Sequence, residues 1–128
     1  MGMILVADDD RLCRDSIQKT LERAGHTVEG AADVDSAIRA TGERAFDLIV
    51  CDYRMPGKTG LDLLAELKEK GSHVPVLMIS AFADANTEAT AQRLGARALL
   101  KKPFRRQELL DHASHALQGN VTRTPCAS

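Results

Sequence analysis

The chain has 128 residues, of which 44% are hydrophobic and 27% are charged, and this composition fits one globular domain with a single core. Its 17 basic residues nearly cancel its 18 acidic residues, and the net charge of −1 argues against a broad electrostatic surface for nucleic acid or an anionic membrane. Function is therefore expected at local sites.

Five short apolar runs recur along the chain, and the middle ones are apolar on consecutive residues, which is typical of strands buried on both faces. The runs are Met3–Ala7, His26–Ala31, Phe46–Cys51, Val74–Ile79 and Arg97–Leu100. Between them, apolar residues recur at helical spacing, as in Leu61, Leu64 and Leu67. Because strand and helix alternate with short links, the sequence predicts a doubly wound α/β domain with parallel strands and helices on both faces of one sheet.

Several residues suit the ends of the expected helices. Asp33 and Asp84 suit N-caps, and Gly25 and Gly71 suit C-terminal caps. Thr59 and Asp62 form a capping-box pattern. These signals set helix boundaries that the apolar spacing leaves open.

The predicted domain covers residues 1–118. Residues 119–128 include Pro125 and little apolar content, which predicts a disordered tail or the start of a linker. Within the domain, the helix expected over residues 84–94 has few large apolar side chains, so we expect it to be weakly anchored and mobile.

Polar residues follow four of the five apolar runs. In parallel α/β sheets, ligands bind beyond the carboxyl ends of the strands, where the strand order reverses. The polar residues are Asp8, Asp9 and Asp10 after the first run, Asp52 after the third, Ser80 after the fourth, and Lys101 and Lys102 after the fifth, where Pro103 follows them. We expect these side chains to converge at one edge of the sheet.

The grouped carboxylates point to phosphoryl chemistry. Two unit charges 4 Å apart repel by about 4 kcal/mol at an effective dielectric near 20, and protonation or Mg2+ offsets such a cost. Asp52 is the candidate nucleophile, because a carboxylate is ionised at neutral pH and needs no general base. Asp8 and Asp9 would hold the metal, while Lys102 and Ser80 would contact the phosphoryl oxygens. Each acid alone would suit a helix cap, but the combination favours a site.

Four segments carry a family resemblance. They are Ile4-Leu5-Val6-Ala7-Asp8-Asp9-Asp10, Asp52-Tyr53-Arg54-Met55-Pro56-Gly57-Lys58-Thr59-Gly60, Ser80-Ala81 and Lys102-Pro103-Phe104. In this order they closely resemble response regulator receiver domains, over about residues 3–118. That family has an acidic pair after the first strand, an aspartate before a Met-Pro-Gly loop, Ser or Thr after the fourth strand, and Lys-Pro after the fifth.

The resemblance implies a flavodoxin-like fold with strand order 2-1-3-4-5. It also implies Asp52 as the phosphorylation site, Asp9 as a direct Mg2+ ligand, Asp8 as a ligand through water and the Arg54 carbonyl as a further ligand. Ser80 and Lys102 would contact the phosphoryl group. The Lys102-Pro103 peptide bond is often cis in this family, which would direct Lys102 inward.

As a receiver domain, the chain would take its phosphoryl group from a histidine kinase or a histidine phosphotransfer protein. It would be a signalling domain rather than an enzyme, although it would assist its own phosphotransfer and autodephosphorylation. Phosphorylation adds a charge of about −1.5 to −2. The resulting population shift would act through the face formed by the fourth helix, fifth strand and fifth helix. Expected partners are an effector domain, a target protein or a second copy, without membrane or direct nucleic-acid binding.

Leu99 departs from the family pattern, which usually has Tyr or Phe three residues before the lysine. Arg54 and Phe82 occupy positions that in this family tend to modulate the lifetime of the acyl phosphate.

A receiver-like module that binds partners without phosphorylation is the main alternative, and Leu99 is its best support. A second alternative is a phosphohydrolase with an aspartate nucleophile, but that class usually has Asp-x-Asp at the first strand and a cap domain.

The remaining reactive residues have simpler interpretations. Cys13, Cys51 and Cys126 stand far apart and form no CxxC pair, which favours reduced thiols. No apolar run approaches the roughly 20 residues of a membrane span, and Asp8 comes too early for a signal peptide. These features predict a cytoplasmic protein.

Overall fold

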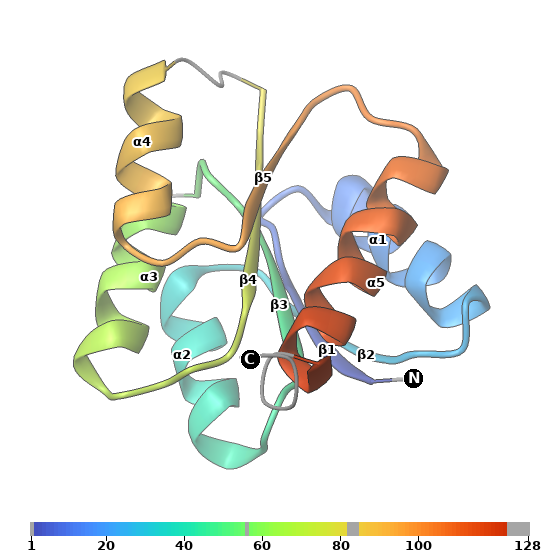
Figure 1. Cartoon of the computed structure of the whole chain (residues 1–128), viewed down its shortest axis with the longest axis horizontal. Helices are drawn as coiled ribbons and strands as arrows, with labels where there is room; N and C mark the ends of the chain where they lie inside the picture. The colour runs from blue at the N-terminus through green and yellow to red at the C-terminus, as the bar shows by residue number, and fades with distance from the viewer. Residues whose placement is uncertain (1, 56, 82–84, 123–128) are drawn as a thin grey trace.

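Five parallel strands form one sheet in the computed structural model, which describes residues 2–55, 57–81 and 85–122 (Figure 1). The strands are β1 (Met3–Ala7), β2 (Thr27–Ala31), β3 (Leu48–Asp52), β4 (Val76–Ser80) and β5 (Ala98–Lys101). Their order in the sheet is β2-β1-β3-β4-β5, which confirms the predicted flavodoxin-like topology. The predicted strands shift by at most two residues at either end.

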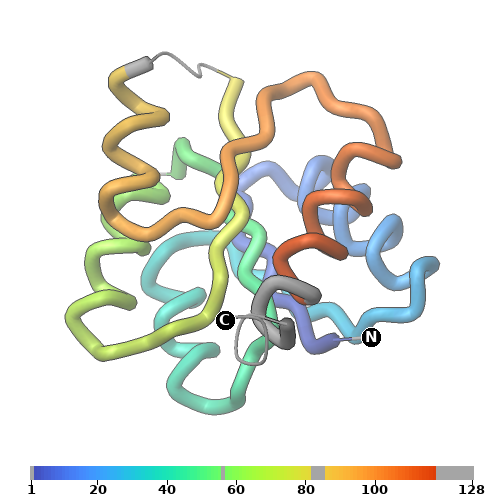
Figure 2. Tube along the Cα trace, viewed as in Figure 1, coloured from blue at the N-terminus to red at the C-terminus, as the bar shows by residue number. Residues whose placement is uncertain are grey.

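Helices cover both faces of this sheet, as the traces in Figures 1 and 2 show. They are α1 (Arg11–Arg23), α2 (Val34–Glu43), α3 (Gly60–Glu69), α4 (Ala85–Arg93) and α5 (Arg106–Thr122). Helices α2, α3 and α4 lie on one face, and α1 and α5 on the other. Helix α5 runs to Thr122, past the boundary predicted at residue 118, and the rest of the predicted tail lies outside the described residues.

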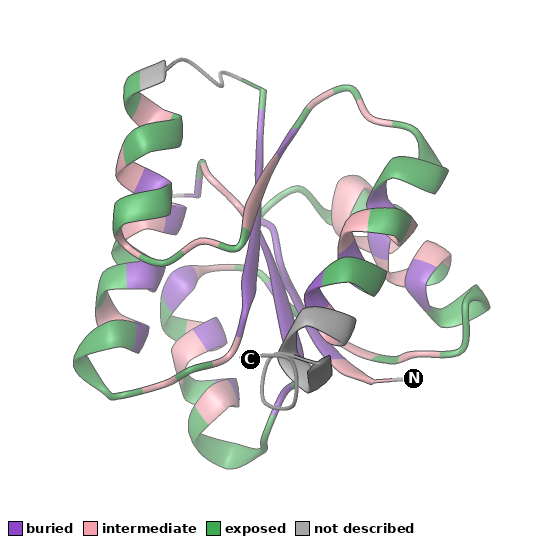
Figure 3. Ribbon diagram, in the orientation of Figure 1, coloured by how far each residue is buried: buried purple, intermediate pink, exposed green. Residues whose placement is uncertain are grey.

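The strands divide their side chains between two apolar layers, and the interior of the sheet is buried along its length (Figure 3). Leu5 and Ile49 pack under α2 and α3, whereas Ile4 and Val50 pack under α1 and α5. Burying a side chain of this size contributes about 1.5–3 kcal/mol, so both layers hold the helices to the sheet. This two-sided burial explains why the strands appear as continuous apolar runs.

The predicted helix ends are largely confirmed. The Oδ1 atom of Asp33 accepts a hydrogen bond from the Ser36 N–H at 2.7 Å, and the Thr59 N–H donates to Asp62 at 2.8 Å. Gly25 follows α1 with a φ of 101°, a left-handed conformation that side chains disfavour. The second predicted N-cap, Asp84, lies outside the described residues.

The register of the strands brings their carboxyl ends together. Ala7 of β1 pairs with Cys51 of β3, and Asp52 pairs with Ile79 of β4. On the far side of β4, Ser80 pairs with Lys101 of β5. The residues that follow β1, β3 and β5 therefore share one edge of the sheet. None of the helices within the described ranges is long and apolar enough to cross a bilayer.

Candidate functional site

Three carboxylates meet at the carboxyl edge of the sheet. Asp8, Asp9 and Asp52 each place an oxygen so that all three atoms lie within 4.8 Å of one another. Asp8 is buried, Asp52 is half-buried and Asp9 is exposed, so the cluster opens toward solvent on one side. The convergence that the sequence predicts for these three residues is confirmed.

Asp8 is the buried member of the cluster, with 1% of its surface exposed. One oxygen, Oδ1, accepts a hydrogen bond from the Asp10 N–H at 2.9 Å, and the Arg14 guanidinium donates to the Asp8 carbonyl at 2.7 Å. The other oxygen, Oδ2, has no hydrogen-bond partner in the described part of the chain. Burial raises the pKa of Asp8, and the charge of Asp52 adds to this effect. The Cys13 thiol, the Asp10 N–H and the charge of Lys102 offset part of this effect, and no described residue donates a hydrogen bond to Oδ2.

Lys102 pairs directly with Asp52. Its Nζ atom lies 2.9 Å from Asp52 Oδ2, with 27% of the lysine side chain and 12% of the aspartate side chain exposed. Burial alone would lower the pKa of Lys102, but the hydrogen bond and charge of Asp52 outweigh it and raise the pKa. The lysine thus stays cationic over the physiological range. The expected cis peptide bond between Lys102 and Pro103 is present.

A cavity of about 520 Å³ opens over this ion pair. Its lining is Asp9, Asp10, Asp52, Arg54, Met55, Thr59, Ala81 and Lys102. Ser80 is 1% exposed and does not line the cavity among the described residues, although it ends the strand beside Asp52. The Ser80 hydroxyl would have to turn toward the cavity to contact a group bound there.

The loop between β3 and α3 is tied at several points. The Arg54 N–H donates to Asp52 Oδ1 at 3.3 Å, and Arg54 forms an isolated bridge with Thr59. Lys58 joins the loop to both neighbouring helices, because its Nζ lies 3.0 Å from Asp35 and 3.2 Å from Glu66. The backbone that carries the Arg54 carbonyl is thus held close to the carboxylates.

The arrangement fits Mg2+, which favours carboxylate and carbonyl oxygens and keeps several waters of its own. Asp8 Oδ2 is the buried polar atom without a partner, and a cation beside it would offset the repulsion within the cluster. The cavity over the Asp52–Lys102 pair also leaves space for an anionic group that contacts both the lysine and a bound cation. The donor set and the cavity together suit a phosphoryl group.

Comparison with known proteins decides the family. The chain matches the response regulator receiver domain family over residues 4–114. It belongs to that family. Among curated relatives, it is 37% identical to the transcriptional regulatory protein FixJ of Bradyrhizobium diazoefficiens, covering 80% of this chain and 50% of FixJ. It is 33% identical to the response regulator protein FleR of Pseudomonas aeruginosa, covering 97% of this chain and 27% of FleR.

Solved receiver structures resemble this chain closely. The receiver domain of NtrX from Brucella abortus is 38% identical, with a TM-score of 0.84, and the match covers 90% of this chain and 98% of that structure. The receiver domain of the Francisella response regulator 1452 is 28% identical, with a TM-score of 0.89 and coverage of 94% and 99%. The chain thus corresponds to one receiver domain and spans half or less of FixJ and FleR.

The structure also brings to the site residues that the sequence analysis did not place there. Arg14 lies one turn into α1 and reaches back to the Asp8 carbonyl, and Met55 and Thr59 line the cavity. Cys13 lies beside Asp8, where burial raises the pKa of its thiol to about 12, so the thiol is protonated. The sequence did contain a signal for Cys13 and Arg14. They stand three and four residues after Asp10, an aspartate that suits a helix cap, and residues at that spacing are neighbours on a helix.

Three residues tied to signalling have different outcomes. Leu99 is half-buried and packs against the core under α2, α3 and α4, so it occupies apolar space rather than an open surface. Phe82, a predicted modulator of the acyl phosphate lifetime, lies outside the described residues. The other such position, Arg54, is exposed at the cavity. Cys51 is buried, and burial raises the pKa of its thiol, in agreement with a packing role.

Proposed function

We propose that Asp52 accepts a phosphoryl group from a histidine kinase or a histidine phosphotransfer protein, and that the domain signals as part of a two-component phosphorelay. The observation that carries this proposal is the Asp52–Lys102 pair at 2.9 Å, set beside Asp8 and Asp9 in one cavity. A half-buried carboxylate next to a fixed cation is suited to receive an anionic group. The receiver family and its named regulators support the same chemistry.

The transfer is a displacement at phosphorus. An oxygen of Asp52 attacks the donor's phosphorus in line, and an O–P bond forms as the P–N bond to the donor imidazole breaks. The electron pair of that bond stays with the imidazole nitrogen. No general base is proposed, because a carboxylate oxygen can attack phosphorus without first losing a proton to another group. Positioning and charge stabilisation therefore provide most of the catalysis.

Lys102 and Ser80 stabilise the product. Lys102 Nζ transfers part of its contact from Asp52 to a phosphoryl oxygen and offsets the charge of about −1.5 to −2 that the group brings. Ser80 donates a hydrogen bond after its hydroxyl turns toward the cavity. Hydrolysis of the acyl phosphate by water then restores Asp52. The domain would therefore assist both its own phosphorylation and its own dephosphorylation.

The magnesium ligands are proposed to be Asp9 directly, Asp8 through water, Asp52, and the carbonyl of Arg54. Bound Mg2+ would neutralise the carboxylates and stabilise charge on the phosphoryl oxygens. The unpaired Oδ2 of buried Asp8 supports its place in this set. The bridge between Arg54 and Thr59 supports the carbonyl ligand, because it fixes the backbone of the loop.

The output surface is proposed to be the face formed by α4, β5 and α5. Leu99 lies on β5 and packs inward, so its repacking would link the phosphorylation site to that face. The occupant would be an effector domain, a target protein or a second copy of the chain. Residues 1–118 would form the receiver and the residues beyond them a tail or linker, with the whole protein in the cytoplasm.

Intact mass measurement tests the phosphoacceptor proposal. The chain is incubated with acetyl phosphate and Mg2+, beside an Asp52→Asn variant and an EDTA control. A gain of one phosphoryl group that requires both Asp52 and Mg2+ is expected. No gain, despite Mg2+ binding to the unaltered chain, would favour the module that binds partners without phosphorylation.

A further inference from the structure

Two adjoining hollows lie at the end of the sheet opposite Asp52, and we call them together the basal groove. One has a volume of about 370 Å³ and lies between the ends of α3 and α4, and the other, of about 280 Å³, lies between the ends of α2 and α3. Both are lined by Leu67, Ser72 and Val74. The shared residues make the two hollows neighbours along the connection from α3 to β4.

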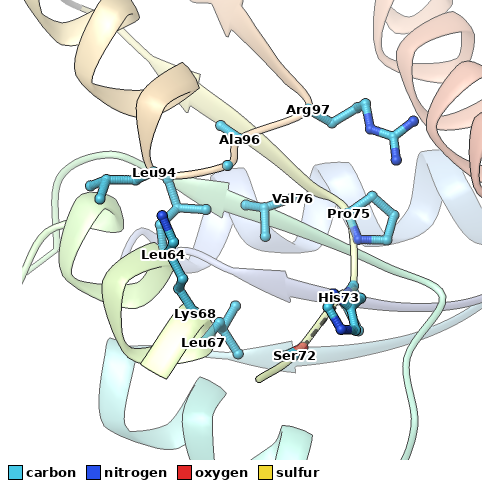
Figure 4. Close-up of a pocket in the computed structure, with 12 residues that line it drawn as sticks. Leu64, Leu67, Lys68, Ser72, His73, Pro75, Val76, Leu94, Ala96 and Arg97 are labelled. Carbon is cyan, nitrogen blue, oxygen red and sulfur yellow. Dashed lines mark hydrogen bonds between the residues drawn. The ribbon is translucent and has the colours of Figure 1, made fainter. Parts of the chain in front are cut away.

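The floor of the basal groove is apolar. Leu64 and Val76 are buried beneath the larger hollow, and Leu94 and Ala96 are half-buried at its side. Figure 4 shows Val76 between Leu64 and Leu94 on one side and Pro75 on the other. Because Leu64 and Val76 are only 3% and 2% exposed, a bound group would gain apolar contact mainly from Leu94 and Ala96, at about 25 cal/mol for each Å² removed from water.

The rim of the groove is basic. Lys68 lies on the side of Leu64 and Leu67, whereas His73 and Arg97 lie on the side of Pro75 (Figure 4). The smaller hollow adds Lys70 and Arg44. Among the described residues, no carboxylate lines either hollow, although the chain has 18 acidic residues.

These cations are also available to a guest. Lys68, Lys70 and Arg97 form no ion pair with any described residue, whereas Arg44 is paired with Glu29 at 3.2 Å. The unpaired cations come from α3 and from the approach to β5, so they are spread along the groove. A spread of this kind suits several carboxylates on one chain better than a single small anion.

We propose that the basal groove binds an acidic peptide segment of a partner protein, in an extended conformation with apolar side chains in the two hollows. In an alternating extended peptide, the apolar side chains face the floor, and the long side chains of Lys68 and Arg97 reach from the two sides of the groove to the acidic side chains on the opposite face. The groove lies at the far end of the sheet from Asp52, so a bound peptide does not contact the phosphoacceptor cavity. The peptide-binding proposal can therefore be tested independently of the phosphoacceptor proposal.

The test uses the full chain and a capped peptide of alternating residues, Glu-Leu-Glu-Leu-Glu-Leu-Glu, followed by amide chemical shifts in NMR spectra. Saturable shifts confined to the residues that line the two hollows, within 38–46, 64–76 and 94–97, are expected, with a dissociation constant below about 1 mM. The Asp52→Asn variant should bind equally well. Affinity should fall as salt is raised from about 50 to 500 mM, because exposed charges are screened.

Paired variants test the charges directly. Lys68→Gln combined with Arg97→Gln should weaken binding about five-fold, since each removes an exposed ion pair with the peptide. Lys19→Gln combined with Arg23→Gln removes the same charge from α1, on the other face of the sheet, and should have no effect.

Several results would overturn the proposal. They are shifts elsewhere on the domain, no saturable shift, equal binding of the corresponding Lys-Leu peptide, and saturation of the same shifts by free glutamate at the same concentration. The last result would show a site for small anions. Since the salt titration uses the unaltered chain, the charge argument can be tested even if a variant does not fold.

Discussion

Gly60 and Gly42 should respond in opposite ways to one added methyl group. A Cβ at Gly60, the first residue of α3, would lie 2.5 Å from Met78 Sδ and 3.0 Å from the Asp52 carbonyl oxygen. A Cβ at Gly42 in α2 would meet no atom within 4 Å. The two sites therefore separate the effect of packing from the effect of helix propensity.

At Gly60 we expect the cost of overpacking to exceed the gain in helix propensity. Overpacking a core costs about 1–3 kcal/mol, whereas replacing glycine by alanine in a helix contributes about 0.5–1 kcal/mol. Met78 is fully buried, and the Asp52 carbonyl belongs to the backbone, so neither has free space into which to move. We expect Gly60→Ala to lower the free energy of unfolding by about 1 kcal/mol and the melting temperature by about 4 °C.

At Gly42 only the propensity effect remains. Gly42→Ala should raise the free energy of unfolding by about 0.4–1 kcal/mol, because alanine restricts the unfolded chain and fits the helix. Urea denaturation followed by circular dichroism measures both changes, with equal slopes confirming that the two variants unfold alike. In a Met78→Val background, the loss from Gly60→Ala should shrink, since the sulfur atom is absent. A Gly60→Ala variant as stable as the unaltered chain would refute the packing argument.

Three further predictions concern charges. Lys102→Met should slow the phosphorylation of Asp52 by acetyl phosphate about 100-fold, measured as intact mass over time. The control Lys101→Met removes an exposed neighbouring charge and should change the rate of phosphorylation little. Asp8→Asn should raise the melting temperature in EDTA, because it replaces a buried carboxylate of raised pKa with a neutral group. The same substitution should abolish the stabilisation by Mg2+. A variant that is less stable than the unaltered chain in EDTA would contradict this account. His26 accepts a hydrogen bond from the Gly2 N–H at 3.0 Å, and burial lowers its pKa, so its stabilising effect is present above the unfolded pKa of about 6.5 and is lost as pH falls below that value through the lowered folded pKa. The urea midpoint of unfolding should therefore change more between pH 7.5 and pH 5.5 for the unaltered chain than for the His26→Gln variant. Equal changes in the two proteins would show that His26 does not cause the pH dependence.

The sequence by itself determined the architecture and most of the proposed phosphoacceptor site. Strands buried on both faces need consecutive apolar residues, so the alternation of strands and helices was visible along the chain. The chemistry of Asp52 and Lys102 followed from their places after the third and fifth runs, because parallel strands end at one edge. Helix ends such as Asp33 and Gly25 were readable because capping depends on residues close in sequence.

Tertiary structure decided what depends on contacts between distant segments. The ion pair between Asp52 and Lys102 joins residues 50 positions apart, and the burial of Asp8 with one unpaired oxygen depends on how α1 packs over β1. Ser80 was correctly placed at the end of its strand, but only the packed sheet showed that it is buried outside the cavity. The cations of the basal groove come from separate elements and gather only when the sheet is assembled, because the folded register, rather than local sequence, fixes such distances.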